Sequence, residues 1–194
     1  MIEFDPQTIR LAQAGDEEAS RTIIRDLHRP ILATIYRFLG PRYRPDYEDI
    51  AQDIFLKLFR AIERFDHDRG VKFTTWAFTF VRNHCFDILN KRRIHTTSIA
   101  GTGEDEKGWE LPDPGSKPPT ETIENTELGR HIEEAVSCLG DEQRMVFVLR
   151  EYEGLDYRAI AEVMQVSEGT IKSRLHRAKE ALRQRLAPYL RTGT

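Results

Sequence analysis

The sequence is poor in cysteine and has no long apolar run. Its two cysteines among 194 residues, Cys85 and Cys138, are far apart and form no CxxC pair. This usage favours free thiols in a reducing compartment over a disulfide. No apolar stretch approaches the roughly 20 residues of a bilayer-spanning helix, and residues 1–10 lack the apolar core of a signal peptide. The sequence therefore predicts a soluble, cytoplasmic protein without membrane insertion.

The chain also lacks the signatures of common catalytic and cofactor sites. It has no nucleophile elbow, no phosphate-binding glycine loop and no cluster of metal ligands. Residues 66–70 resemble only the start of a calcium loop, and His84 beside Cys85 has no further ligand at zinc spacing. We therefore expect no catalytic residue, no metal and no cofactor, and a hydrolase using His84 and nearby acids is the weakest functional alternative.

Charge is unevenly distributed along the chain, although the net charge is only −3. Residues 167–194 hold seven Lys and Arg against two acids, whereas residues 96–127 hold eight acids against two lysines. The latter stretch is rich in Gly and Pro without any period, which is typical of a linker. A cationic C-terminal end thus follows an acidic tether.

Residues 153–185 predict two helices separated by a tight break. Asp156 is a candidate N-cap for the first helix, Gln165 and Val166 interrupt the pattern, and Ser167 is a candidate N-cap for the second. Spacings of four, three and four give the second helix one apolar stripe, formed by Ile171, Leu175, Ala178 and Leu182. This arrangement is typical of a helix-turn-helix.

The rest of the second helix is polar and cationic. At about 100° per residue, the face opposite the apolar stripe holds Gly169, Ser173, His176 and Arg177. The major groove of DNA admits an α-helix, and its base edges offer acceptors to Arg and Lys. A solvated charged face is the alternative, but the cap, the turn and the preceding short helix together favour DNA binding. The predicted DNA contacts are Thr170, Lys172, Ser173, Arg174, His176, Arg177 and Lys179.

Apolar residues at helical spacing predict three helices in the N-terminal half. The first covers residues 16–40 with Pro30 as a kink or junction, and the second begins at Asp46 or Tyr47. The third, residues 73–93, begins at a cap formed by Thr74 or Thr75. It combines aromatic rings with cations, as single-strand-binding surfaces do. Aromatics at helical spacing are also typical of a core, so we expect Trp76 and Phe80 to be mainly structural.

Two more helices precede the helix-turn-helix, one ending at Gly140 and one capped by Asp141. The sequence therefore predicts an all-α protein of two small helical domains joined by a flexible acidic linker. Its expected parts are an N-terminal domain over residues 1–95, the linker over residues 96–127 and the helix-turn-helix domain over residues 128–194.

Three stretches resemble the extracytoplasmic-function (ECF) sigma factors of the sigma-70 family. The run DIAQDIFLKLFRAIERFD looks like the family's polymerase-binding helix, and FTTWAFTFVRNHCFDILNKRR looks like its segment for promoter melting and −10 reading. Residues 139–183 are similar to its −35-reading domain at most positions. The resemblance implies a promoter-specificity subunit that acts with core RNA polymerase on promoter DNA to start transcription of a stress- or signal-responsive regulon, under an anti-sigma factor.

The resemblance also implies roles for single residues. The loop from Phe65 to Phe73 would capture a flipped −10 base, and the acidic linker would run toward the RNA exit path. Asp53 stands where Glu is commoner in the family, which keeps the charge. The implied polymerase contacts are Asp49, Gln52, Asp53 and Phe55. The implied −10 contacts are Phe65, Lys72, Trp76, Asn83, Arg92 and Arg93. The implied −35 contacts include Lys172, Ser173, His176 and Arg177.

A stand-alone helix-turn-helix regulator is the main alternative, but it leaves the aromatic and basic N-terminal half without a purpose. Free cationic surfaces bind nucleic acid non-specifically. We therefore expect a monomeric free chain whose functional faces are masked, either by packing of one domain on the other or by an anti-sigma factor.

Overall fold

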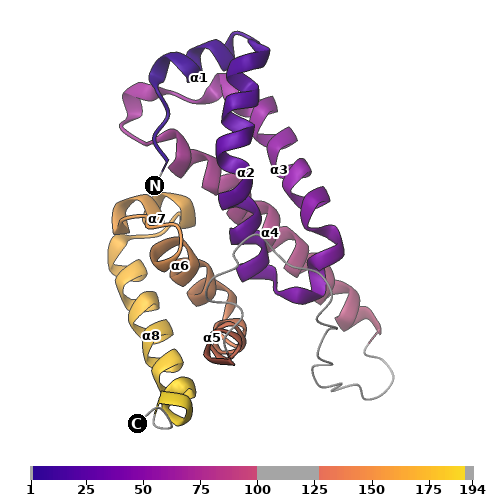
Figure 1. Ribbon diagram of the computed structural model, residues 1–194, viewed down its shortest axis with the longest axis vertical. Helices are drawn as coiled ribbons and strands as arrows, with labels where there is room; N and C mark the ends of the chain where they lie inside the picture. Colours follow the sequence, from indigo (N-terminus) through magenta and orange to yellow (C-terminus); the bar gives the residue numbers. More distant parts are fainter. Residues whose placement is uncertain (1, 100–126, 191–194) are drawn as a thin grey trace.

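The computed structural model of the protein describes residues 2–99 and 127–190, and every regular element in these two ranges is helical. This confirms the all-α prediction, while most of the predicted linker lies outside the described residues. None of the helices in these ranges is long and apolar enough to cross a membrane. The α-helices (Figure 1) are α1 (Pro6–Gln13), α2 (Glu17–Leu39), α3 (Tyr47–Ala61), α4 (Phe73–Ile99), α5 (Glu127–Ser137), α6 (Asp141–Glu151), α7 (Tyr157–Met164) and α8 (Glu168–Leu190).

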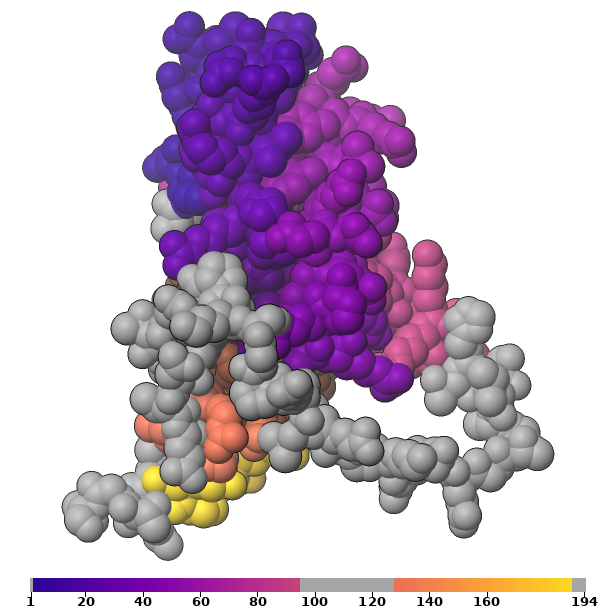
Figure 2. All heavy atoms as spheres, turned by 45° about the vertical axis from the view of Figure 1, so that its right-hand side comes forward, coloured from indigo at the N-terminus to yellow at the C-terminus, as the bar shows by residue number. Residues whose placement is uncertain are grey.

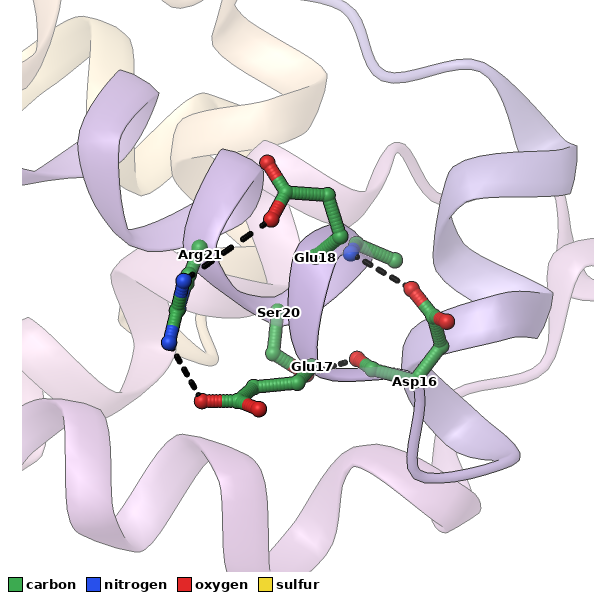
Figure 3. Close-up of polar contacts among 6 residues, drawn as sticks. Asp16, Glu17, Glu18, Ser20 and Arg21 are labelled. Carbon is green, nitrogen blue, oxygen red and sulfur yellow. Dashed lines mark hydrogen bonds and ion pairs between the residues drawn. The ribbon is translucent and has the colours of Figure 1, made fainter.

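Asp16, where the first helix was expected to begin, is the N-cap of α2. The Asp16 carboxylate accepts a hydrogen bond from the Ala19 backbone N–H at 2.8 Å, and the Ser20 hydroxyl donates to the Asp16 carbonyl oxygen at 2.8 Å (Figure 3). Arg21 forms an exposed ion pair with Glu17 at 2.6 Å. Exposed pairs contribute little to stability, so the satisfied N–H groups at the first turn define this helix start.

Helix α1 was not among the helices predicted from the sequence. The Asp5 carboxylate caps this helix by accepting from the Gln7 N–H at 3.0 Å. At its other end, the Gln13 side-chain amide donates to the carbonyl oxygens of Ile62 at 3.0 Å and Phe65 at 2.8 Å. These bonds attach α1 to the chain that leaves α3.

Two predicted caps are wrong. The third helix begins at Phe73, and Thr74 and Thr75 lie buried within its first turn rather than in front of it. The N-cap position of α6 is Gly140, and Asp141 is the first helical residue. Sequence alone could not separate these positions, because Thr and Asp are favoured both at the cap and in the first turn.

Helices α2, α3 and α4 pack around a shared apolar core. Cys85 of α4 is fully buried there, and burial raises the pKa of its thiol well above the ordinary value. Cys138 is exposed, and both cysteines are free thiols, as predicted. The fully buried residues of this core include Ile23, Leu27, Ile31, Ile35, Phe38, Ile54, Leu58 and Val81.

The same core continues into the C-terminal half. Met145, Val146 and Leu149 of α6 belong to one cluster with the α2 and α4 residues, as do Ile160 and Val163 of α7. Helix α4 packs on α7, and α2 packs on α5 and α6 (Figure 1). The space-filling view shows the two halves in contact (Figure 2). A second, smaller apolar cluster joins α5 to α8.

Polar contacts cross between the halves around this core. The Thr34 hydroxyl donates to the Glu153 carboxylate at 3.0 Å. The Tyr36 hydroxyl donates to Glu133 at 2.9 Å. The Arg37 guanidinium lies 4.1 Å above the ring centroid of Tyr152. One edge of α2 therefore bonds to α5 and to the turn after α6.

Burial raises the pKa of the Glu153 carboxyl above its ordinary value, although the Thr34 hydrogen bond and the Arg37 charge act in the opposite direction. Between the ordinary and the raised pKa, the folded chain holds a proton that the unfolded chain has released. The contribution of this group to stability therefore decreases as the pH rises through that window.

We expect Glu153→Gln to raise Tm at neutral pH, because the amide keeps an acceptor for Thr34 and removes the buried charge. The Tm difference between variant and wild type should shrink as the pH falls through the raised pKa towards the ordinary one. Thermal unfolding followed by circular dichroism across acidic to neutral pH measures it. A difference that stays constant with pH would show that ionised Glu153 carries no such cost.

Candidate promoter and polymerase interfaces

The helix-turn-helix has the predicted caps and break. The Asp156 carboxylate accepts from the Ala159 N–H at 2.7 Å, and the Ser167 hydroxyl accepts from the Thr170 N–H at 3.2 Å. Gln165 adopts the left-handed conformation at φ 57° and ends α7. Helix α8 therefore follows α7 after a short turn, and the Ser167 hydroxyl caps the first turn of α8.

The apolar stripe of α8 determines which of its faces meets solvent. Ile171, Leu175, Ala178 and Leu182 are all buried against the neighbouring helices, as predicted. Lys172, Ser173, His176 and Arg177 are all exposed. Burial of one edge leaves these four side chains together on the opposite surface, which has the dimensions and the hydrogen-bond donors that a major groove accepts.

Two other predicted DNA contacts form ion pairs with α6. Arg174 is largely buried and pairs with Glu142, whereas Lys179 pairs with Glu151 at 2.9 Å and remains exposed. Thr170 is half-buried at the start of α8, where its carbonyl oxygen accepts from the Ser173 hydroxyl at 2.9 Å. The helical angle placed the two cations at the sides of α8, but sequence does not reveal which acids stand opposite them.

The predicted −10 aromatics form a cluster rather than an open stacking platform. Phe65 is buried, with its ring centroid 5.1 Å from that of Phe73 and 5.3 Å from that of Trp76. Trp76 is half-buried and lies 4.8 Å from Phe80 in an edge-on arrangement. This supports the expectation of a mainly structural role for Trp76 and Phe80.

The predicted −10 polar residues lie along the loop before α4 and on α4 itself. Lys72, Asn83, Arg92 and Arg93 are exposed. Lys72 forms an ion pair with Glu3 at 3.2 Å, and the Asn83 side-chain oxygen accepts from Arg82 at 2.8 Å. Arg93 pairs with Asp141 of α6 at 2.6 Å, so it bonds across the two halves.

The predicted polymerase contacts on α3 divide into two groups. Asp49, Gln52 and Asp53 are exposed on one surface. Phe55 is buried and stacks on His28 with ring centroids 6.4 Å apart, so it stabilises the helix from inside.

His84 of α4 contacts Lys57 of α3, and spacing in the sequence does not reveal this contact. The Lys57 ammonium donates to His84 Nδ1 at 2.5 Å, and Asp53 lies 3.7 Å from Nε2. Burial lowers the pKa of His84, and the Lys57 charge lowers it further. A neutral imidazole accepts at one nitrogen, so His84 connects α4 to Lys57 of α3 by this hydrogen bond, with the Asp53 carboxylate nearby.

The packing of the two halves does not cover these surfaces. The α3 acids and the four exposed α8 residues all meet solvent, whereas Arg93 pairs with Asp141 across the interface. Masking by the other domain, one of the two arrangements expected from the sequence, therefore does not apply to these residues.

Comparisons with known proteins place this geometry in a family. Residues 23–94 match the family Sigma-70 region 2, and residues 130–182 match Sigma-70, region 4. The sigma factor RpoE of Bartonella quintana, solved in complex with the anti-sigma factor NepR, has a similar fold. Its TM-score is 0.64 at 22% identity, covering 86% of this chain and 96% of that one.

Two relatives match almost end to end. The RNA polymerase sigma-H factor of Pseudomonas aeruginosa is 32% identical over 97% of each chain. The ECF RNA polymerase sigma factor SigW of Bacillus subtilis is 30% identical, covering 92% of this chain and 94% of its own. On these matches, the chain belongs to the sigma-70 family and, within it, to the ECF RNA polymerase sigma factors.

Proposed function

We propose that the chain works in the cytoplasm as a promoter-specificity subunit, without catalytic residues of its own. The surface of α8 reads the −35 element, the loop before α4 and α4 itself contact the −10 region, and the acids of α3 bind core RNA polymerase. The observation that supports this most directly is the burial of one edge of α8 with four polar residues exposed on the other.

The exposed residues of α8 differ in what they offer to DNA. Arg177 carries a guanidinium that can donate two parallel hydrogen bonds to a guanine edge. Lys172 of α8 is also exposed. Its ammonium lies 5.7 Å from the ring centroid of Tyr157, the first residue of α7. Lys179 pairs with Glu151, so we assign it a contact with a DNA phosphate at the edge of the surface rather than with a base.

We expect Arg177→Ala to weaken promoter binding by the holoenzyme by about 1–3 kcal/mol and to relax preference at one −35 position. Lys179→Ala should weaken binding evenly across sequences. Both are measured by titrating holoenzyme against duplexes that differ at single −35 positions. If both variants lose affinity evenly, α8 does not divide base reading from phosphate binding as proposed.

The α3 acids present a negative surface on a rigid helix. Asp49 and Asp53 lie one turn apart and are both exposed. Such a surface suits a basic surface of the polymerase.

We expect Asp49→Lys combined with Asp53→Lys to weaken binding to core polymerase at least tenfold, because two attractions become repulsions. The control is Glu17→Lys with Glu18→Lys, which changes the same charge on exposed positions of α2. Competition for core polymerase against wild type measures both. Equal loss in the two variants would indicate a general charge effect rather than an interface at α3.

We further propose that the packed form is the free state and that an anti-sigma factor masks what the packing leaves exposed. The related sigma factor of Bartonella quintana was solved with such a partner. The partner covers the exposed cations of α8, which lowers non-specific DNA binding, and the exposed acids of α3, which blocks binding to core polymerase.

We expect the free chain to scatter as a compact monomer. Thr34→Asp places a carboxylate against Glu153 in a buried site, and the repulsion should separate the halves. Small-angle scattering should then change from a one-body to a two-body profile, with unchanged helix content by circular dichroism. An extended profile for the wild type would refute the packed free state.

A further inference from the structure

The chain segment before α1 lies across the loop that precedes α4. We call residues 2–5 the N-terminal arm. Glu3 of this arm pairs with Lys72 at 3.2 Å, and the Phe4 ring meets the Phe73 ring edge-on with centroids 5.5 Å apart. One charge contact and one ring contact therefore hold the arm on the loop.

A cavity of about 370 Å³ lies between the arm and the loop. This volume is within the range of small-ligand pockets. Glu3 and Phe4 line it from the arm, and His67, Lys72 and Thr74 are among the lining residues on the other side. The cavity therefore combines an aromatic wall with groups that form hydrogen bonds and ion pairs.

The rings of Phe4, Phe65 and Phe73 form one wall of the cavity, and the Lys72 ammonium lies at its half-exposed rim. Nε2 of His67 and the hydroxyl oxygen of Thr74 have no hydrogen-bond partner in the described part of the chain, but both atoms are covered by their neighbours. The ring wall and the lysine at the rim suit one unpaired nucleotide, whose base enters the cavity while its phosphate meets the lysine.

We propose that the N-terminal arm controls access of a melted-strand nucleotide to this cavity, with the Glu3 carboxylate occupying on Lys72 the place of a backbone phosphate. The proposal rests on the proposed contact of this loop with the −10 region, and it adds a competitor from within the chain. Glu3 and a phosphate present the same anionic oxygens to the same ammonium, so they exclude each other.

The ion pair between Glu3 and Lys72 is exposed and therefore weak. The Glu3 and Lys72 side chains are 74% and 50% exposed, so water and salt screen their attraction. A phosphate can therefore displace Glu3 at modest cost. The arm therefore lowers the affinity of the loop for every single strand. A strand whose base also fills the cavity displaces the arm more readily than a strand that contacts Lys72 alone.

The experiment measures binding of a short oligothymidylate to the full-length chain by quenching of Trp76, which lies beside this cluster at 5.3 Å from Phe65. The sequence has two tryptophans, and a Trp109→Phe background leaves Trp76 as the only fluorescent one. We expect Glu3→Gln to bind about two- to fivefold more tightly, as for release of an exposed ion pair. The slope of log affinity against log salt should steepen by up to about 0.7, the value for one further single-strand phosphate contact.

Two controls separate this effect from a general change in charge. Glu63→Gln removes an exposed carboxylate from the same half and should leave the affinity unchanged. In a Lys72→Gln background, Glu3→Gln should have no effect. The proposal is overturned if Glu3→Gln and wild type bind the oligothymidylate with equal affinity, or if neither of them binds it. It is also overturned if Glu63→Gln gains as much affinity as Glu3→Gln. Promoter-directed transcription by the wild-type holoenzyme is scored separately, so loss of the proposed function is distinguishable from loss of arm control.

Discussion

The Arg144 guanidinium holds together the place where the two halves meet. It donates to the carbonyl oxygen of Phe38 at 2.7 Å and to that of Leu139 at 3.0 Å, and it also bonds to the Ser137 carbonyl. These carbonyls belong to the last turn of α2 and to the end of α5, where a helix leaves its acceptors unsatisfied. Burial lowers the pKa of Arg144, but the guanidinium stays charged. Its rigid planar fork presents several donors in fixed directions, whereas a lysine ammonium sits on a flexible stem.

The orientation of α8 depends on this junction. Arg144 fixes the turn between α5 and α6, and α6 in turn packs on α8 and pairs with it through Glu142 and Glu151. The two ion pairs lie on the side of α8 that faces α6, and the apolar stripe lies beside them. The surface proposed for DNA is therefore what remains after two internal requirements are met. The ion pair with Glu142 removes Arg174 from that surface, whereas Lys179 stays exposed beside Glu151.

Local rules predicted the parts of the structure that depend on local contacts. Asp156 and Ser167 act as the predicted caps because each needs only an N–H three residues away. The apolar stripe of α8 followed from helical spacing alone. The arrangement of the halves did not follow, because it depends on pairs such as Thr34 and Glu153 that are far apart in sequence.

The same limit applies to the predicted sites. Sequence identified Lys72, Arg93 and Arg174 as cations suited to DNA, and all three engage carboxylates on other elements. Their partners, Glu3, Asp141 and Glu142, carry no local pattern that marks them as partners. Burial of Phe65 was hidden for another reason, because an aromatic at the end of a helix satisfies both a core and a stacking pattern.

The contacts between the halves also bear on how the protein works. Thr34, Tyr36 and Arg93 bond across the interface through groups that water can replace, whereas Met145 and Ile160 add apolar contacts that water cannot. Separation therefore costs chiefly the exposure of apolar surface. A partner shifts this equilibrium only by its differential affinity for the separated form. A partner that binds only when the two halves are apart has such a preference. A partner that binds only the packed chain has the opposite preference, so the interface sets the free energy that separates the two forms.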